Sequence, residues 1–239
     1  MDAQLTTTPP TLPVIERVVV GFDCSPSASD ALRCGAVLAR ELGARIEAVQ
    51  TWQYPATTVI HGGATRLADR ASVDAQVTDE MERAVAELLQ GDARVVDCRV
   101  ERGPAAPALV RHAHGPTALV VLGSRDLTAT DRVLLGSTTH DVLHGTVAPV
   151  LVVPAGQEPR DLQRIVVGVD GAPGSQEAVL LAGSLALQAG AQVVAVHATD
   201  QARHHQSDRA EHAAWVAERL EGPWTGDLAR GPATWPGGA

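Results

Sequence analysis

Short β-branched runs alternate with amphipathic stretches along the chain. The first run, residues 17–21, ends in Gly-x-Asp at Asp23, which is typical of a buried parallel strand that leads into a binding loop. Pro26 then begins a stretch whose small apolar residues recur at helical spacing up to residue 42, and Gly43 ends it. The pattern therefore opens with a strand, a loop and a helix.

The same alternation continues to Pro154. It predicts the following further elements: a strand over 46–52, a long helix over about 67–90, a strand over about 94–101, a helix over about 105–114, a strand over 118–122, a short helix over about 137–144 and a strand over 150–153. Strands that alternate with helices form a parallel sheet with helices on both faces. We therefore predict an α/β fold with a doubly wound parallel five-stranded sheet.

The beginning of this pattern is duplicated. Residues 17–52 align without gaps to residues 164–199, and thirteen of these thirty-six positions are identical. The second copy continues with a predicted helix over about 208–220 and a poor strand near 227–230. No sequence then remains for a fourth and a fifth strand, so we expect a truncated second copy.

We divide the chain into four parts on this basis. They are a disordered leader over 1–16, a first domain over 17–155, a linker over 156–163 and a partial second domain over 164–239. The leader lacks the basic and apolar regions of a signal peptide, and no apolar stretch is long enough to span a bilayer. We therefore expect no membrane association.

Charge and composition exclude several functions. The formal net charge is −9, which disfavours nucleic acid as a partner, since binding to phosphate backbones needs clustered positive charge. All nineteen basic residues are Arg, so neither a Walker A lysine nor Schiff-base chemistry is available. Three cysteines without Cys-x-x-Cys spacing fit a reducing compartment, and we predict a cytoplasmic location.

The segment GSRDLTATDRVLLGS, residues 123–137, is a candidate phosphate-binding loop. Gly123 and Gly136 allow backbone N–H groups to approach a ligand closely, and Ser137 begins a predicted helix whose N-terminus favours an anion. Asp126 opposes this interpretation because its charge repels a phosphate, unless a cation bridges the two or an arginine pairs with the carboxylate.

These motifs, together with the closing strand APVLVVP, resemble the universal stress protein family in its tandem two-domain form. The resemblance implies an adenine nucleotide alpha hydrolase-like sheet in the order 3-2-1-4-5. It also implies ATP binding through G-x2-G-x9-G-(S/T), in which Gly123, Gly136 and Ser137 match and Asp126 replaces the second glycine. By the family's pattern Asp23 and Val49 line the side of the nucleotide pocket that holds the adenine.

The remaining residues implied by the resemblance surround the ribose and phosphates. The full set of expected nucleotide-binding residues is Asp23, Val49, Leu122, Gly123, Arg125, Asp126, Gly136, Ser137 and Thr138. The resemblance thus favours a stress-response sensor or regulator that binds ATP, with or without Mg²⁺, at one site in the first domain. It also implies a homodimer or a pair of domains within one chain.

An alternative function is a dimerisation or adaptor protein of the same fold, in which Asp126 marks a lost nucleotide site. A slow ATP hydrolase is a third possibility, although the sequence offers no recognisable general base, catalytic triad or metal cluster. We therefore assign no catalytic and no metal-binding residues.

Three smaller features have competing interpretations. Asp23 recurs as Asp170 in the copy without a phosphate loop, so it is either a ligand-binding carboxylate or a cap for the adjacent helix. Cys24 is a reactive thiol if its surroundings are electropositive, and otherwise an inert one. His140 and His144 are four residues apart and suit a metal from one face; without a third ligand at fixed spacing, we interpret them as an exposed polar face.

Overall fold

The structure, a computed structural model, describes residues 13–53, 70–90, 95–124, 136–156 and 160–197. The chain forms two compact units. The first unit comprises residues 15–161, and the second unit comprises residues 1–14 together with 162–239. Each unit is described separately below.

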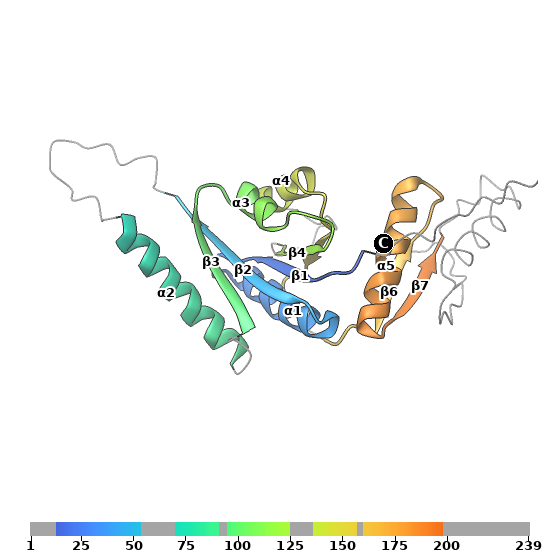
Figure 1. The fold of residues 1–239 in the computed structure, drawn as a ribbon, viewed down its shortest axis with the longest axis horizontal. Helices are drawn as coiled ribbons and strands as arrows, with labels where there is room; N and C mark the ends of the chain where they lie inside the picture. The colour runs from blue at the N-terminus through green and yellow to red at the C-terminus, as the bar shows by residue number, and fades with distance from the viewer. Residues whose placement is uncertain (1–12, 54–69, 91–94, 125–135, 157–159, 198–239) are drawn as a thin grey trace, which may run out of the picture. The chain divides into compact units, whose positions relative to one another are not determined.

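The first unit is built on a parallel sheet of five strands in the order β3-β2-β1-β4-β5 (Figure 1). The strands are β1 (Arg17–Gly21), β2 (Arg45–Trp52), β3 (Val96–Arg102), β4 (Ala118–Gly123) and β5 (Val150–Val153). All four strand pairs are parallel, with Val20 beside Ala48 on one side and Val121 on the other. The predicted fold class and the strand order implied by the resemblance are both confirmed.

Helices cover both faces of this sheet. The first unit contains α1 (Pro26–Leu42), α2 (Arg70–Leu89), α3 (Ala105–His112) and α4 (Ser137–Gly145). Helices α3 and α4 contact each other on one face, and α1 lies on the opposite face against β1 and β4 (Figure 1). Helix α2 packs on β3 and α1, with Met81 and Val85 buried. The predicted start of α2 at residue 67 lies outside the described residues.

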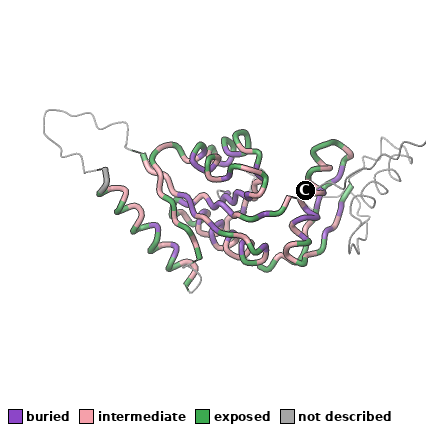
Figure 2. The backbone as a smooth tube through the Cα atoms, viewed as in Figure 1, coloured by how far each residue is buried: buried purple, intermediate pink, exposed green. Residues whose placement is uncertain are grey.

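The centre of the core is strand β1. Val18, Val19 and Val20 are all 0% exposed, because β1 has a neighbouring strand on each side and a helix layer on each face (Figure 2). A central strand of a doubly wound sheet is buried in this way, so its sequence is continuously apolar instead of alternating.

Helix α1 begins and ends at local sequence signals. The hydroxyl of Ser25, the N-cap residue, accepts a hydrogen bond from the backbone N–H of Ala28 at 3.2 Å, and Pro26 takes the first helical position. Gly43 ends the helix in the left-handed conformation, with φ of 64°. Between them Gly35 faces β1, where an added Cβ would lie 2.7 Å from Val20 Cγ2.

The described residues 162–197 of the second unit repeat the first part of this arrangement. They contain β6 (Arg164–Gly168), α5 (Pro173–Ala189) and β7 (Gln192–Val196), and β6 and β7 form a parallel two-stranded sheet. These three elements correspond to β1, α1 and β2 of the first unit, as the duplicated sequence predicts. The predicted helix over 208–220 and strand over 227–230 lie outside the described residues.

The folded part of the chain begins before residue 17, where the sequence placed the end of a leader. Ile15 is 1% exposed in the first unit, and the backbone N–H of Glu16 donates to the carbonyl oxygen of Thr117 at 2.9 Å. In the second unit the hydroxyl of Ser184 donates to the carbonyl oxygen of Pro13 at 2.6 Å. Residues 13–16 are therefore part of the packed structure.

Within the described part of the chain, no helix is both long enough and apolar enough to cross a membrane.

Substitution of Gly35 by Ala should destabilise the first unit. The new methyl group would meet Val20 Cγ2 at 2.7 Å, so α1 must move away from the sheet, and overpacking of this kind costs about 1–3 kcal/mol. Urea denaturation of wild type and Gly35→Ala measures the loss in free energy of unfolding.

The double variant Gly35→Ala/Val20→Ala is the control for this steric argument. Val20→Ala removes the crowding methyl group, so the double variant should be more stable than the sum of the two single losses predicts, by about 0.5–3 kcal/mol. Strictly additive losses would show that the contact with Val20 does not require glycine at position 35.

Candidate functional site

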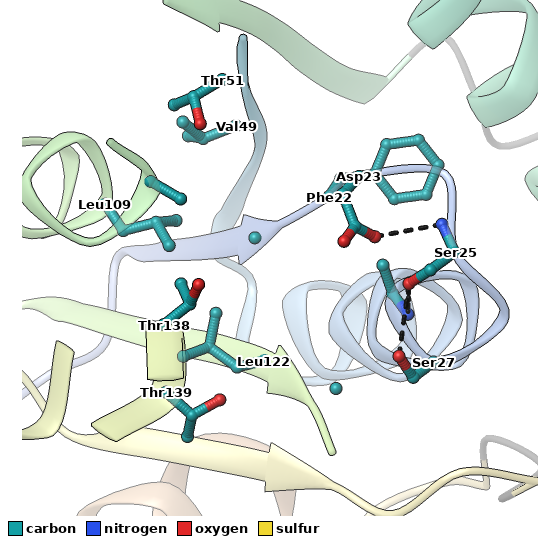
Figure 3. Close-up of a pocket in the computed structure, with 14 residues that line it drawn as sticks. Phe22, Asp23, Ser25, Ser27, Val49, Thr51, Leu109, Leu122, Thr138 and Thr139 are labelled. Carbon is teal, nitrogen blue, oxygen red and sulfur yellow. Dashed lines mark hydrogen bonds between the residues drawn. The ribbon is translucent and has the colours of Figure 1, made fainter. Parts of the chain in front are cut away.

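A pocket of about 130 Å³ opens at the carboxyl ends of β1 and β4 (Figure 3). The chain order of the sheet reverses between these two strands, which is where doubly wound folds bind ligands. The pocket is lined by Gly21, Phe22, Asp23, Ser25, Ser27, Ala28, Val49, Thr51, Ala105, Leu109, Leu122, Gly123, Thr138 and Thr139. The lining therefore comes from β1, α1, β2, α3, β4 and α4 together.

The structure brings five of the nine expected site residues into this pocket: Asp23, Val49, Leu122, Gly123 and Thr138. Gly136 is the N-cap of α4 and Ser137 is its first residue, so both precede Thr138 without lining the pocket themselves. Arg125 and Asp126 lie outside the described residues. Gly123 and the N-terminus of α4 thus meet at one edge of the sheet.

Asp23 shapes the loop that leaves β1. One of its carboxylate oxygens, Oδ1, accepts a hydrogen bond from the backbone N–H of Ser25 at 3.0 Å, while the hydroxyl of Ser25 caps α1 (Figure 3). The side chain of Asp23 therefore fixes the turn before the helix, and Ser25 provides the cap that the sequence analysis considered for Asp23. The carboxylate still lies on the wall of the pocket.

The second unit keeps the same turn. Asp170 Oδ1 accepts a hydrogen bond from the backbone N–H of Ala172 at 2.9 Å. This bond, together with one involving the hydroxyl of Ser175, holds the pKa of the Asp170 carboxyl below its ordinary value. Because this turn recurs in both units, it is a property of the duplicated strand, loop and helix.

Cys24 occupies a left-handed backbone conformation in this turn, with φ of 61°. Gly171, at the corresponding position of the second unit, has φ of 84°, a conformation that glycine adopts without strain. Partial burial, and then the nearby carboxylates of Asp23 and Glu80, raise the pKa of the Cys24 thiol. The surroundings of Cys24 are therefore acidic, which disfavours the reactive thiolate.

The rest of the pocket wall combines apolar side chains with hydroxyl groups. Val49, Leu109 and Leu122 belong to its apolar part, and all three are less than 5% exposed. Hydroxyl groups come from Ser25, Ser27, Thr51, Thr138 and Thr139 (Figure 3). Among the described lining residues Asp23 alone is charged. A bound anion would therefore meet hydroxyl groups and backbone N–H groups at this part of the site.

Several lining residues were not predicted from the sequence, and the local signals that could have indicated them differ. Ser25 and Ser27 follow Asp23 directly, so the start of the predicted helix was a detectable signal. Thr139 adjoins Thr138 in the same way. Thr51 and Leu109 come from β2 and α3, and no local pattern indicates that they face this loop.

The two glycines of the candidate loop have different surroundings. A Cβ atom on Gly123 would lie 2.3 Å from the carbonyl oxygen of Ser27, so only glycine lets the end of β4 pass the first turn of α1. A Cβ atom on Gly136 would meet no atom of the described residues within 4 Å. Gly123 thus has a packing role, whereas the described residues leave the space beside Gly136 open.

Helix α3, which carries Leu109, is held over the sheet by ionic contacts. The ring of His112 contacts Glu47 Oε1 through Nδ1 at 2.6 Å and Glu101 Oε1 through Nε2 at 2.7 Å. Arg111 also pairs with Glu101. Hydrogen bonds from Arg111 first, and then from His112, hold the pKa of the Glu101 carboxyl below its ordinary value of 4.5.

Comparison with known sequences finds one family across both units. A sequence model of the universal stress protein family matches residues 15–154 and 162–223. A universal stress protein of Mycobacterium tuberculosis (strain ATCC 25618 / H37Rv) is 28% identical over 199 residues, covering 76% of this chain and 62% of that protein. One from Mycolicibacterium smegmatis is 38% identical over 81 residues, covering 33% of this chain and 28% of that protein. This chain thus spans less than two thirds of the length of these relatives.

Comparison with solved structures supports the fold. The crystal structure of a universal stress protein from Archaeoglobus fulgidus DSM 4304 superposes with a TM-score of 0.62, covering 84% of this chain and 74% of that chain. The sequence identity between the two is 17%, so this likeness shows a shared fold.

Substitutions of the two loop glycines should differ in their cost. Gly123→Ala forces the end of β4 away from the Ser27 backbone and should lower the free energy of unfolding by about 1–3 kcal/mol. Gly136→Ala adds a methyl group in open space and should cost less than about 1 kcal/mol, chiefly through the weaker N-cap. Urea denaturation compares the two variants, and equal losses would contradict the assigned packing role of Gly123.

Glu101→Gln tests the attachment of α3 through its pH dependence. The pKa of Glu101 is lower in the folded state than in the unfolded state. The carboxylate therefore contributes its full stabilisation of the fold above the unfolded-state pKa, and this stabilisation is lost as the pH falls through the folded-state pKa. The variant should therefore be less stable by about 1 kcal/mol at pH 7. The difference from wild type should close as the pH falls through the folded-state pKa of Glu101, which lies below 4.5.

The control for this pH dependence is Glu87→Gln, which changes an exposed carboxylate on α2. It should change the stability at pH 7 by less than about 0.5 kcal/mol. Urea denaturation at several pH values measures both variants. A loss in Glu101→Gln that stays constant from pH 7 to pH 3 would contradict the ionic attachment of α3.

Proposed function

Because this chain belongs to the universal stress protein family, we propose that its first unit binds an adenine nucleotide and acts as a stress-response sensor or regulator. The observation that carries this proposal is the meeting of Asp23, Val49, Leu122, Gly123 and Thr138 in one pocket at the switch point of the sheet. Four separate elements bring these residues together, although they are far apart in the sequence.

The pocket suits the base of a nucleotide better than a whole nucleotide. Its volume of about 130 Å³ is below the roughly 300–1,000 Å³ of sites that enclose drug-sized ligands. In the proposed complex the base contacts the apolar side chains of Val49, Leu109 and Leu122, and the carboxylate of Asp23 accepts hydrogen bonds from it. The ribose and phosphates then extend beyond the enclosed space.

The N-terminus of α4 is the proposed binding position for the phosphates. Its first backbone N–H groups lack intrahelical partners, and the positive end of the helix dipole favours an anion. Gly136 leaves open space beside this end, and the hydroxyls of Ser137 and Thr138 are available as donors. Arg125 completes the proposed set on the family's pattern.

A Mg²⁺ ion fits this site only as a partner of the phosphates. Within the described residues no group of three His, Cys, Asp or Glu side chains lies together as a metal centre. In the proposed complex the phosphate oxygens and water therefore hold the ion, with Asp126 as the candidate carboxylate. This arrangement would offset the repulsion between Asp126 and the phosphates.

We propose a regulatory role without turnover. In the described part of the pocket Asp23 is the one candidate base, and its carboxylate already holds the turn to Ser25. Nucleotide binding would instead shift the population of loop or oligomer states, which other components detect. A homodimer or a domain pair is the proposed assembly, and the cytoplasm, where the free thiols of Cys24, Cys34 and Cys98 stay reduced, is the proposed location.

The alternative function is an adaptor of the same fold that has lost its nucleotide site through Asp126. One observation favours it: among the described lining residues the single charge, on Asp23, is negative. A triphosphate would receive no compensating charge from these residues.

Calorimetric titration with ATP and Mg²⁺ decides between the two functions. Asp23→Ala should weaken binding at least tenfold, because it removes a polar contact to the base and loosens the pocket loop. Asp170→Ala is the matched control, since it removes the same turn from the second unit, and should leave the affinity unchanged. Without Mg²⁺, Asp126→Gly should bind ATP more tightly than wild type, because it removes the repulsion between the carboxylate and the phosphates. No heat from wild type or Asp126→Gly at millimolar ATP would contradict the proposed function and favour the adaptor.

A further inference from the structure

Two histidines lie side by side on the outward face of α4. This helix buries Thr139 and Val142 against the first unit, while His140 and His144 are exposed. The two imidazole rings have centroids 4.3 Å apart and planes inclined by 32°. The helix therefore holds two ring systems at short range with free access from solvent.

In both imidazole rings the hydrogen bond involves Nδ1, so Nε2 of each ring is available to a ligand. His144 Nδ1 lies 2.8 Å from the carbonyl oxygen of His140, and His140 Nδ1 lies 3.4 Å from Asp141 Oδ1. Since both partners are acceptors, Nδ1 of each neutral ring carries the hydrogen and Nε2 presents its lone pair. Histidines that bind metals show this arrangement, in which the other ring nitrogen donates to a carboxylate or a backbone carbonyl.

We propose that His140 and His144 bind one divalent transition-metal ion through their Nε2 atoms, with water in the remaining coordination positions. Imidazole pairs suit Cu²⁺, Ni²⁺ and Zn²⁺, whereas Mg²⁺ and Ca²⁺ prefer oxygen ligands. Among the described residues no third side chain completes a metal cluster, so this is a two-ligand site of moderate affinity. The net charge of −9 favours the approach of a cation.

This site is independent of the proposed nucleotide pocket. It takes a different class of cation, and neither histidine lines the pocket. From the sequence alone the pair is interpreted as an exposed polar face, because no third ligand stands at a fixed spacing. The new observation is the matching pair of Nδ1 contacts, which the spacing of four residues alone does not indicate.

Titration of the full chain with NiCl₂ at pH 7.5, followed by calorimetry, tests the proposal. A background variant with His204→Asn and His205→Asn removes the adjacent histidine pair of the C-terminal segment. In this background His140→Gln and His144→Gln should each weaken Ni²⁺ binding at least tenfold, because a single imidazole remains. Cu²⁺ should bind more tightly than Ni²⁺, and Mg²⁺ should not compete.

His114→Gln in the same background is the matched control. His114 is exposed, and its Nδ1 contacts the carbonyl oxygen of Arg111 at 2.9 Å, but Val110 and Ala118 stand four residues away from it. Its substitution should change the Ni²⁺ affinity by less than twofold. Circular dichroism verifies that all variants fold, as expected for exposed positions.

Thermal unfolding gives a second readout. Millimolar Ni²⁺ should raise the melting temperature of the background variant and leave that of His140→Gln unchanged, because binding to the folded helix stabilises it by mass action. Equal Ni²⁺ affinity in the background variant, His140→Gln and His144→Gln would overturn the proposal. The proposal would also be overturned if His114→Gln lost as much Ni²⁺ affinity as His140→Gln and His144→Gln, or if the background variant did not bind Ni²⁺ at millimolar concentration.

Discussion

The close packing of α1 against the sheet determines the geometry of the first unit. Gly35 lets the middle of the helix approach Val20, and Gly123 lets the end of β4 pass within contact of Ser27 at the start of the helix. These two approaches fix the distance between the loop after β1 and the end of β4. The pocket exists because the same two segments form its walls.

Comparison of the two units distinguishes features that follow from the local sequence from features that require the complete five-stranded sheet and its helices. Val19 and Val49 are 0% and 3% exposed in the first unit, whereas their counterparts Val166 and Val196 are 64% and 38% exposed in the second. Helix α3 accounts for the difference in the first unit, since its residues belong to the same core cluster as Val19 and Val49. The described part of the second unit has the turn but neither α3 nor α4 to complete a pocket.

The elements of the fold were predictable where their signals are local. Pro26 and Gly43 mark the two ends of α1, and the apolar run of β1 indicates a buried parallel strand; the structure agrees with both. Periodicity does not indicate which strands are neighbours, so the strand order depended on the family resemblance. Ile15 was missed because a single buried residue ahead of the first strand has no periodic pattern.

The candidate site was predictable only through that resemblance, and only in part. Asp23 and Gly123 stand in recognisable motifs at strand ends, and both line the pocket. Thr51 and Leu109 belong to no recognisable motif. They line the pocket because the connections of the fold bring β2 and α3 to it, which the local sequence does not indicate. The pairing of donors and acceptors around His140 and His144 likewise requires ring orientations, which spacing in the sequence does not specify.

The recurrence of the Asp-centred turn gives this molecule an internal reference. The amide groups of Ser25 and Ala172 occupy equivalent positions, and each donates to its own aspartate. Ser25 lines the pocket that α3 and α4 complete, so a ligand bound there would change the surroundings of the Ser25 amide and not those of the Ala172 amide. In nuclear magnetic resonance, a shift of the Ser25 amide signal that the Ala172 amide signal does not share would report occupancy of the pocket.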